Sequence, residues 1–452
     1  MVKVILFVVV LFTGSVLFAQ KLTLLYGGDV MSHGPQIKAA YHPATDSYEY
    51  DASFQFVKPI IQQADIAIVN LEVTHAGKPY AGYPQFSAPD ELSTALKTAG
   101  FDVLLTANNH SCDGGSKGVI RTLDVLDKIG MKHTGTFRNK AERDATYPLM
   151  LEKNGIRLAL LNYTYGTNGL TVAAPLIINY IDSNVIQKDV KKAKALGAEY
   201  IVCTLHWGTE YQSLPSSYQK KWEDFCYSIG VDMIIGSHPH VIQPVERKTI
   251  NKKDHFTAWS LGNYVSNQRD RYKNGGLMVT TTLERRDKVE LADVHHLFHY
   301  VHVGQDRGVK CYYMLPEFPY NDYKKGFLPL EDKIKMDLFF SDSRSLFKEH
   351  SKGSTEIKID STSEIGKTFI AALTGYYAVQ IESRTDTIKP SYAYSDSILR
   401  LLTTNGKIIY SSQPISSKET ARNRKENWKK EHPDKPIQLL FVRPESIEIL
   451  TE

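Results

Sequence analysis

The sequence predicts an α/β protein in which layers of helices cover β-sheets. Short apolar segments alternate with segments of helical periodicity between Lys21 and Ile235, and each apolar segment runs into a polar loop. The predicted strands are Lys21–Gly28, Asp65–Asn70, Phe101–Thr106, Arg157–Asn162, Tyr200–Leu205 and Met233–Ile235. The predicted helices are Phe54–Gln63, Leu92–Ala99, Gly115–Ile129, Asn184–Leu196 and Gln219–Ile229.

The pattern changes in the second half of the chain. From Phe256 to about Leu315 the sequence is rich in strand signals, and we expect these strands to complete a pair of sheets. The 452 residues exceed what one core usually supports. We therefore predict a domain over residues 20–316 and an additional C-terminal region of unknown function over residues 317–452, with a lysine-rich helix at Ser417–His432.

The first nineteen residues have the pattern of a secretory signal peptide. Lys3 precedes an almost wholly apolar run from Val4 to Phe18, and the small residue Ala19 follows. The sequence thus predicts export to the periplasm or cell envelope. An uncleaved membrane anchor is the alternative, although the run is shorter than the ~20 residues that a spanning helix needs. A net charge of +4 is too small to indicate a nucleic-acid partner.

Side chains that can bind metal or move protons follow five of the predicted strands. In chain order these are Asp29, Glu72, Asn109 with His110, His206, and His238 with His240. Carboxylates, an amide oxygen and imidazoles, without a thiolate, suit Mn, Zn or Fe. Without His110, six metal donors remain, which are too many for one tetrahedral ion and suit two ions that share a carboxylate. Such a pair activates water for attack on a phosphate ester.

Each of these residues also has an ordinary structural interpretation. His238 and His240 taken alone could be two surface histidines beside Pro239. Asp29 could cap a turn, and Glu72 could be a solvated acid at a strand end. The repetition of suitable donors at successive strand ends favours the metal site.

An ordered series of motifs resembles one known family. The motifs are Gly28-Asp29, Asn70-Leu71-Glu72, Asn108-Asn109-His110, His206-Trp207-Gly208, Gly236-Ser237-His238-Pro239-His240 and Ser260-Leu261-Gly262-Asn263-Tyr264. They are similar to those of CapA-type poly-γ-glutamate capsule-synthesis proteins, which belong to the calcineurin-like metallophosphoesterases. The resemblance covers about Leu22 to Leu315 and implies two packed mixed β-sheets flanked by helices, with two divalent metal ions as cofactors.

The resemblance also implies a role for each ligand position. Asp29 would bind the first ion, which His240 completes, and Glu72 would bridge the two ions. The second ion would be bound by Asn109, His206 and His238. The chain departs from many calcineurin-like enzymes in having Met31, not histidine, two residues after Asp29, and a glutamate in the bridging position.

Other residues would act around the ligands. His110 matches the residue that protonates the leaving oxygen, although it could also be a structural imidazole. Asp113 and Glu210 are predicted to orient imidazoles, and Tyr165 and Asn263 to contact the substrate or support a ligand. His33 is more simply explained as a surface or pocket histidine than as a substitute ligand.

The functional prediction is an exported, metal-dependent hydrolase of the CapA type. It would attack a phosphate or related ester of a cell-envelope polymer, with membrane proteins of capsule synthesis as partners. The alternative is a non-catalytic envelope scaffold that assists synthesis or export of an anionic polymer, and Met31 favours it. Hydrolysis of the amide bonds of such a polymer by the same hydroxide is chemically open as well.

Overall fold

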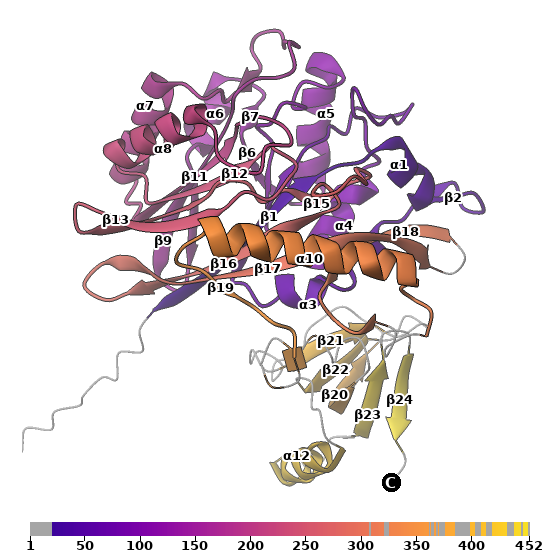
Figure 1. Ribbon diagram of the computed structural model, residues 1–452. Coiled ribbons are helices and arrows are strands. Elements are labelled where there is room, and N and C mark those ends of the chain that lie inside the picture. Colours follow the sequence, from indigo (N-terminus) through magenta and orange to yellow (C-terminus); the bar gives the residue numbers. More distant parts are fainter. Residues whose placement is uncertain are drawn as a thin grey trace, which may run out of the picture.

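The computed structural model describes most of the chain (Figure 1). The described residues are 20–306, 309–320 and 325–360, with shorter stretches at 362, 366–367, 369, 376–384, 398–402, 408–412, 418–431, 438–443 and 446–450. The predicted signal peptide lies outside them. None of the helices among these residues is both long and apolar enough to cross a membrane.

The first large sheet is mixed and contains the N-terminal strand near its middle. Its order is β18 (Val309–Pro316), β17 (Val289–Asp306), β16 (Gly275–Arg285), β1 (Lys21–Val30), β4 (Ile66–Leu71), β5 (Val103–Leu105) and β6 (Lys132–Thr134). Strands β1, β4, β5 and β6 are parallel, whereas β16, β17 and β18 are antiparallel. Two short strands join this sheet, β15 (Asn263–Val265) beside β1 and β19 (Thr355–Glu356) beside β17.

The second large sheet is also mixed. Its order is β13 (Val245–Ile250), β14 (Lys253–Ala258), β12 (Met233–Ser237), β11 (Tyr200–His206), β9 (Ile156–Thr164) and β8 (Leu149–Lys153). Alternate residues of β9 face opposite sides, as the two-residue period of a strand requires. Leu158 and Leu160 lie in the core shared with the first sheet, whereas Ala159 and Leu161 pack in a second core.

Helices cover the outer faces of both sheets (Figure 1). Helix α4 (Glu91–Ala99) buries Leu92 and Leu96 in the first core, and α7 (Ser183–Ala195) and α8 (Ser217–Ile229) bury Ile186 and Cys226 in the second. The remaining helices of this body are α1 (Gly34–Ala40), α2 (Asp51–Phe54), α3 (Lys58–Ile61), α5 (Gly115–Lys128), α6 (Lys140–Thr146) and α10 (Leu330–His350). Two pairs of short strands complete it, β2 (Tyr41–His42) with β3 (Ser47–Tyr48) and β7 (Thr136–Phe137) with β10 (Ile177–Ile178). The predicted architecture, two packed mixed sheets flanked by helices, is confirmed.

One predicted helix is wrong. The expected helix over Phe54–Gln63 is two short helices, α2 and α3, because Pro59 has no N–H to continue the hydrogen-bond ladder from α2. Pro59 lies in the first turn of α3, where a missing N–H costs nothing.

The residues after Pro316 contribute to two different parts of the structure. Helix α10 packs along β17, where the ring centres of Phe339 and Tyr300 are 6.2 Å apart. Further along the chain, an antiparallel sheet has the order β21 (Ile398–Leu402), β22 (Ile408–Ser412), β20 (Tyr376–Arg384), β23 (Gln438–Arg443) and β24 (Ser446–Leu450). Helix α12 (Lys418–Glu431) contacts β20 and β23 and overlaps the predicted lysine-rich helix. The proposed boundary at residue 316 stays a prediction.

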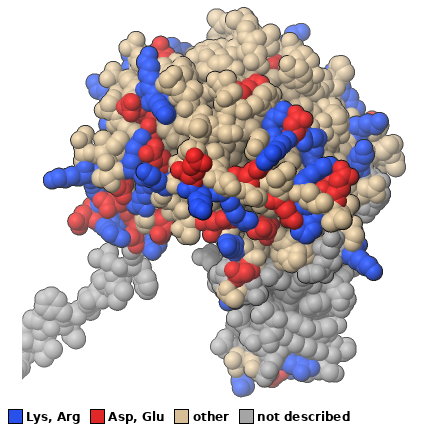
Figure 2. Space-filling view, viewed as in Figure 1, with Lys and Arg blue, Asp and Glu red and all other residues tan. Residues whose placement is uncertain are grey.

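The surface around α10 mixes charges of both signs, as Figure 2 shows. Arg271 pairs with Asp342 of α10 at 2.7 Å, and Arg344 pairs with Glu356 at 2.7 Å. Such exposed pairs contribute little stability each. Positive and negative side chains therefore alternate on this face.

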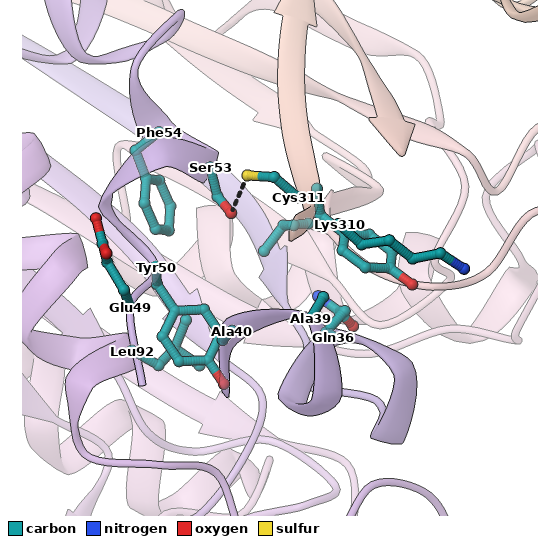
Figure 3. Close-up of a pocket in the computed structure, with 12 residues that line it drawn as sticks. Gln36, Ala39, Ala40, Glu49, Tyr50, Ser53, Phe54, Leu92, Lys310 and Cys311 are labelled. Carbon is teal, nitrogen blue, oxygen red and sulfur yellow. Dashed lines mark hydrogen bonds between the residues drawn. The ribbon is translucent and has the colours of Figure 1, made fainter. Parts of the chain in front are cut away.

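The four cysteines, all within the described part of the chain, are buried and none is in a disulfide. Figure 3 shows Cys311 of β18 beside a small pocket that also borders α1 and α2. Its Sγ lies 3.5 Å from the Ser53 hydroxyl. This pocket contains none of the candidate ligands.

His299 of β17 provides a testable pH dependence. Its ring is buried and bonds to the Tyr264 carbonyl at 2.9 Å, and burial lowers its pKa to about 4. An unfolded histidine titrates near pH 6.5, so the unfolded chain binds more protons between pH 6.5 and 4. The contribution of neutral His299 to the free energy of unfolding is therefore fully present above pH 6.5. Between pH 6.5 and 4 this contribution falls by roughly 3 kcal/mol.

Urea unfolding from pH 7 to 4 tests this expectation. His299→Asn should show a shallower fall in the free energy of unfolding than the wild type. The control His350→Asn, at an exposed histidine of α10, should follow the wild-type curve. Parallel curves for His299→Asn and the wild type would contradict the prediction.

Candidate metal centre

Strand ends from both sheets bring the candidate ligands together. Asp29 lies in β1 and Glu72 directly follows β4, its parallel neighbour, where the Glu72 N–H donates to the Val30 carbonyl at 3.1 Å. His206 ends β11 and His238 directly follows β12, its parallel neighbour in the second sheet. Because the two sheets pack together, the C-terminal ends of these strands lie close to one another in the interior of the protein.

The candidate ligands form two groups that share one residue. The first is Asp29, Glu72 and His240, and the second is Glu72, His206 and His238; within each group the ligand atoms lie within 4.8 Å of one another. Glu72 Oε1 is 3.4 Å from His206 Nε2 and 3.6 Å from His240 Nε2. The structure thus brings together the residues that the family resemblance grouped, with Glu72 in both groups.

Asn109 completes the second group. Its Oδ1 lies 2.7 Å from His206 Nε2, and its amide donates to the Asn168 Oδ1 at 3.3 Å. The bond to Asn168 therefore fixes which end of the Asn109 amide turns toward the imidazole. This role of Asn168 was not predicted, although the pair Asn168-Gly169 is a recognisable turn signal, and Asn168 has a left-handed φ of 52° in the structure.

The electrostatics of the group fit bound cations. Burial and the neighbouring Asp29 raise the pKa of Glu72 well above its usual range, and burial lowers the pKa of His238 to about 3. Glu72 Oε1 and His238 Nδ1 are among several buried side-chain atoms of the described residues that have no hydrogen-bond partner. Oxygen and imidazole donors without thiolates suit Mn, Zn or Fe, and a divalent cation would satisfy both orphaned atoms.

Asn70 of β4 ties the two halves of the centre together. Its amide donates to Asp29 Oδ1 at 2.8 Å and lies 3.4 Å from His206 Nδ1, while its Oδ1 accepts from the Asn108 amide at 3.2 Å. Ser237 gives His206 Nδ1 a further partner at 2.9 Å. These supporting roles were not predicted, although Asn70 lies two residues before Glu72 and so shares its face of the strand.

The two histidines after β12 have unusual backbone conformations. His238 has φ 99° and His240 has φ 56°, in the left-handed region that non-glycine residues seldom adopt. Their ring centres lie 6.1 Å apart, and the His238 N–H donates to Asp29 Oδ2 at 3.2 Å. Surrounding contacts must stabilise a strained backbone of this kind, and such backbone conformations are concentrated at functional sites.

The position of Asp29 depends on the glycine before it. The Asp29 N–H donates to the Gly262 carbonyl at 2.9 Å. A Cβ added at Gly28 would lie 2.0 Å from that same carbonyl oxygen. Gly28 is therefore required for the close approach of β1 to the segment that leads into β15.

Asn263 and Asp113 support neighbouring imidazoles, as predicted. Asn263 Oδ1 lies 3.1 Å from His240 Nδ1, and its amide donates to the His240 carbonyl at 3.2 Å. Asp113 Oδ2 lies 2.7 Å from His110 Nδ1 and accepts the Phe86 N–H at 2.7 Å. Each carboxylate or amide thus fixes one ring orientation.

The remaining candidates lie around this centre. The Tyr165 ring centre is 4.6 Å from that of His238, and Glu210 is exposed. Burial and then the Glu210 charge raise the pKa of Tyr165 to about 12. That Glu210 orients an imidazole stays a prediction.

His33 and Met31 remain outside the two groups of ligands found among the described residues. Met31 is buried, and His33 begins α1 with its Nδ1 3.1 Å from Gln36 Oε1. Burial lowers the pKa of His33 to about 4, with smaller contributions from His240 and His110. That His33 is a surface or pocket histidine stays a prediction.

The layered sheets, with carboxylates and imidazoles buried together at their strand ends, have the arrangement that the family resemblance implied. Residues 23–268 match the family described as "Bacterial capsule synthesis protein PGA_cap". The chain belongs to this family, and the recognition made from the sequence motifs is confirmed.

Two relatives place the chain further. It is 30% identical over 260 residues to the capsule biosynthesis protein CapA of Bacillus anthracis, covering 55% of this chain and 61% of that protein. It is 31% identical over 260 residues to the PGA biosynthesis protein CapA of Bacillus subtilis strain 168, covering 54% and 65%. The match thus spans less than two thirds of the length of either relative.

Solved structures are similar at a lower level. The calcineurin-like phosphoesterase YfkN from Bacillus subtilis is 14% identical with a TM-score of 0.39, covering 62% of this chain and 91% of that one. The NAD nucleotidase of Haemophilus influenzae is 11% identical with a TM-score of 0.38, covering 78% and 59%. Likeness at this level says nothing about function.

Proposed function

We propose that this chain is an exported, metal-dependent hydrolase that acts on a phosphate or related ester of a cell-envelope polymer. The observation that carries the proposal is the pair of buried ligand groups joined by Glu72. One carboxylate between two sets of donors suits two divalent ions, Mn, Zn or Fe. Two ions so placed would supply an activated water and neutralise charge on the phosphoryl oxygens.

The protein's own residues would hold and orient these reactants. Asp29 and His240 would bind one ion, and Asn109, His206 and His238 the other. His110 would donate a proton to the leaving oxygen. Because Asp113 bonds to His110 Nδ1, that proton would come from Nε2.

The biological setting rests on the relatives. Their names concern capsule and PGA biosynthesis, and they support an envelope polymer as the substrate for this chain. Membrane proteins of capsule synthesis would be its partners. Export would follow from the apolar segment at residues 1–19, which a mature N-terminus near Gln20 in exported material would test.

Elemental analysis combined with a panel of phosphate esters tests the proposed activity. We expect two ions per chain and hydrolysis of an aryl phosphate monoester or diester in the presence of Mn or Zn. Removal of the ions with a chelator should abolish turnover, and their return should restore it. Two bound ions without turnover of any ester would overturn the catalytic proposal.

His110→Asn tests the leaving-group role. We expect kcat to fall on the order of 100-fold while the metal content is retained, because proton donation contributes about this much. The loss should be larger for an alkyl phosphate than for an aryl phosphate, since an alkoxide needs the proton more. Steady-state kinetics with both esters measure this, and an equal loss would contradict it.

A non-catalytic scaffold for an anionic polymer is the second candidate, and buried Met31 favours it. Met31 occupies the position where many calcineurin-like enzymes have a histidine ligand. The two candidates differ in metal content. A stable protein that binds the polymer without any metal ion would support the scaffold.

A further inference from the structure

Two half-exposed tyrosines lie beside the candidate metal centre, each next to a different candidate histidine ligand. Tyr165 is 40% exposed with its ring centre 4.6 Å from that of His238, and Tyr211 is 46% exposed with its ring centre 6.3 Å from that of His240. The two imidazoles belong to different ligand groups. A molecule bound at both ions would therefore have an aromatic ring near each ion.

The backbone conformation of Tyr211 indicates that its ring has a role other than stabilising the fold. Its φ is 65°, in the left-handed region where a bulky side chain is an outlier. The same loop has a glycine, Gly208, at another position of positive φ, whereas a tyrosine occupies position 211. A ring that is nearly half exposed gains little from burial, so the strain points to a function outside folding.

A second loop fixes the Tyr211 ring and connects it to the centre. The Lys273 ammonium lies 4.4 Å from the ring centre, and the Gln268 amide donates to the Tyr211 hydroxyl at 3.4 Å. The Asn263 amide in turn donates to the Lys273 carbonyl at 2.8 Å and to Gln268 Oε1 at 2.9 Å. Because Asn263 also bonds to His240, the ring and the candidate ligand share one support.

The charges around the ring disfavour a polyanion at this position. Lys273 is paired with Asp270 at 2.5 Å, and exposed Glu210 adds a negative charge next to Tyr211. A flat aromatic face beside amide and carboxylate groups suits a neutral, hydroxyl-rich ring instead. Its C–H groups can pack on the aromatic face while its hydroxyls bond to the polar side chains.

We propose that Tyr211, together with Tyr165, binds the sugar ring of a sugar-phosphate ester whose phosphate lies at the candidate metal centre. The proposal rests on the proposed function for the position of the phosphate. It makes Tyr211 a specificity-determining residue, which selects the group attached to the phosphate.

Calorimetry on the manganese-loaded protein tests the proposal without requiring turnover. The probes are glucose 6-phosphate, ethyl phosphate and phenyl phosphate. In Tyr211→Asn, the preference for glucose 6-phosphate over ethyl phosphate, as a ratio of Kd values, should fall at least tenfold. Tyr211→Phe keeps the ring and should retain most of the preference. The control Tyr218→Asn, at an exposed tyrosine of α8, should leave it unchanged.

Several outcomes would overturn the proposal. The first is an unchanged preference for glucose 6-phosphate in Tyr211→Asn. The second is an equal loss of affinity for phenyl phosphate and glucose 6-phosphate in Tyr211→Asn, which would indicate a planar aromatic ligand. The third is that the wild-type protein binds none of the three esters. A melting temperature of Tyr211→Asn below that of the wild type would assign the ring to folding and overturn it too. Normal binding without hydrolysis would instead sink the catalytic proposal alone.

Discussion

Replacing Glu72 with glutamine is expected to remove both metal ions and to abolish ester hydrolysis. Glu72 is the one residue common to both ligand groups, and its Oε1 lies within 3.6 Å of imidazoles from each. Loss of a residue that merely supports a ligand costs about 10–100-fold in metal affinity or activity, so loss of a shared ligand should cost more. Elemental analysis and kinetics with an aryl phosphate measure both effects.

The same variant should change stability in opposite directions with and without metal. In the metal-free protein, burial and Asp29 disfavour the charged Glu72, so the neutral glutamine should raise the free energy of unfolding by about 1 kcal/mol or more. With manganese present, the wild type should be the more stable protein, because the ions bind only its folded state.

A matched control separates this effect from the loss of any buried carboxylate. Glu223→Gln removes a buried acid of α8 that pairs with Lys248 at 2.6 Å, outside the candidate centre. It should change the free energy of unfolding by the same amount with and without manganese and should retain both ions. If Glu72→Gln behaved in the same way, Glu72 would not be a shared ligand.

His238→Ala and His240→Ala should each remove one ion and most of the activity. The two residues belong to separate groups, so each variant should keep the ion that the other loses. A pair of ions acts together on the water and the phosphoryl group, and either loss should therefore abolish hydrolysis of an aryl phosphate. Loss of both ions from either variant would show a single, cooperative site.

His255→Ala is the control for these variants. His255 is a buried histidine of β14 whose ring packs on Tyr227, with the ring centres 4.2 Å apart. Its removal should lower the stability and leave two ions per chain. Full activity of His238→Ala beside this control would refute the mechanism.

The sequence predicted where the strands lie along the chain and which polar residues follow them. Apolar runs that stop at Asp29, Glu72 or His206 are visible in the sequence without a structure. Because parallel strands place their carboxyl ends at one edge of a sheet, the residues after these runs can be expected to lie close together. The grouping around Glu72 came from the family resemblance, and the structure places the same residues together. The predicted helix at Phe54 failed where Pro59 overrode helical spacing.

Other features depend on contacts that no local pattern contains. The role of Asn70 requires that β1 and β4 pair with Asp29 opposite Asn70, and that the second sheet brings His206 against it. The left-handed conformations of His238 and Tyr211 are equally hidden, because most non-glycine residues have a negative φ and only the structure shows these exceptions. Such features arise from the register between sheets and from strain that the surrounding packing supports.

The order in which the chain is made limits when this centre can form. All six candidate ligands precede residue 241, yet Asp29 is held by the Gly262 carbonyl, and β1 has β16 as one of its two long partners. A fragment that ends at Ile250 would contain every ligand and still leave one edge of β1 open to pairing with other chains. We expect such a fragment to aggregate, and a minimal metal-binding piece to extend at least to Arg285, the end of β16.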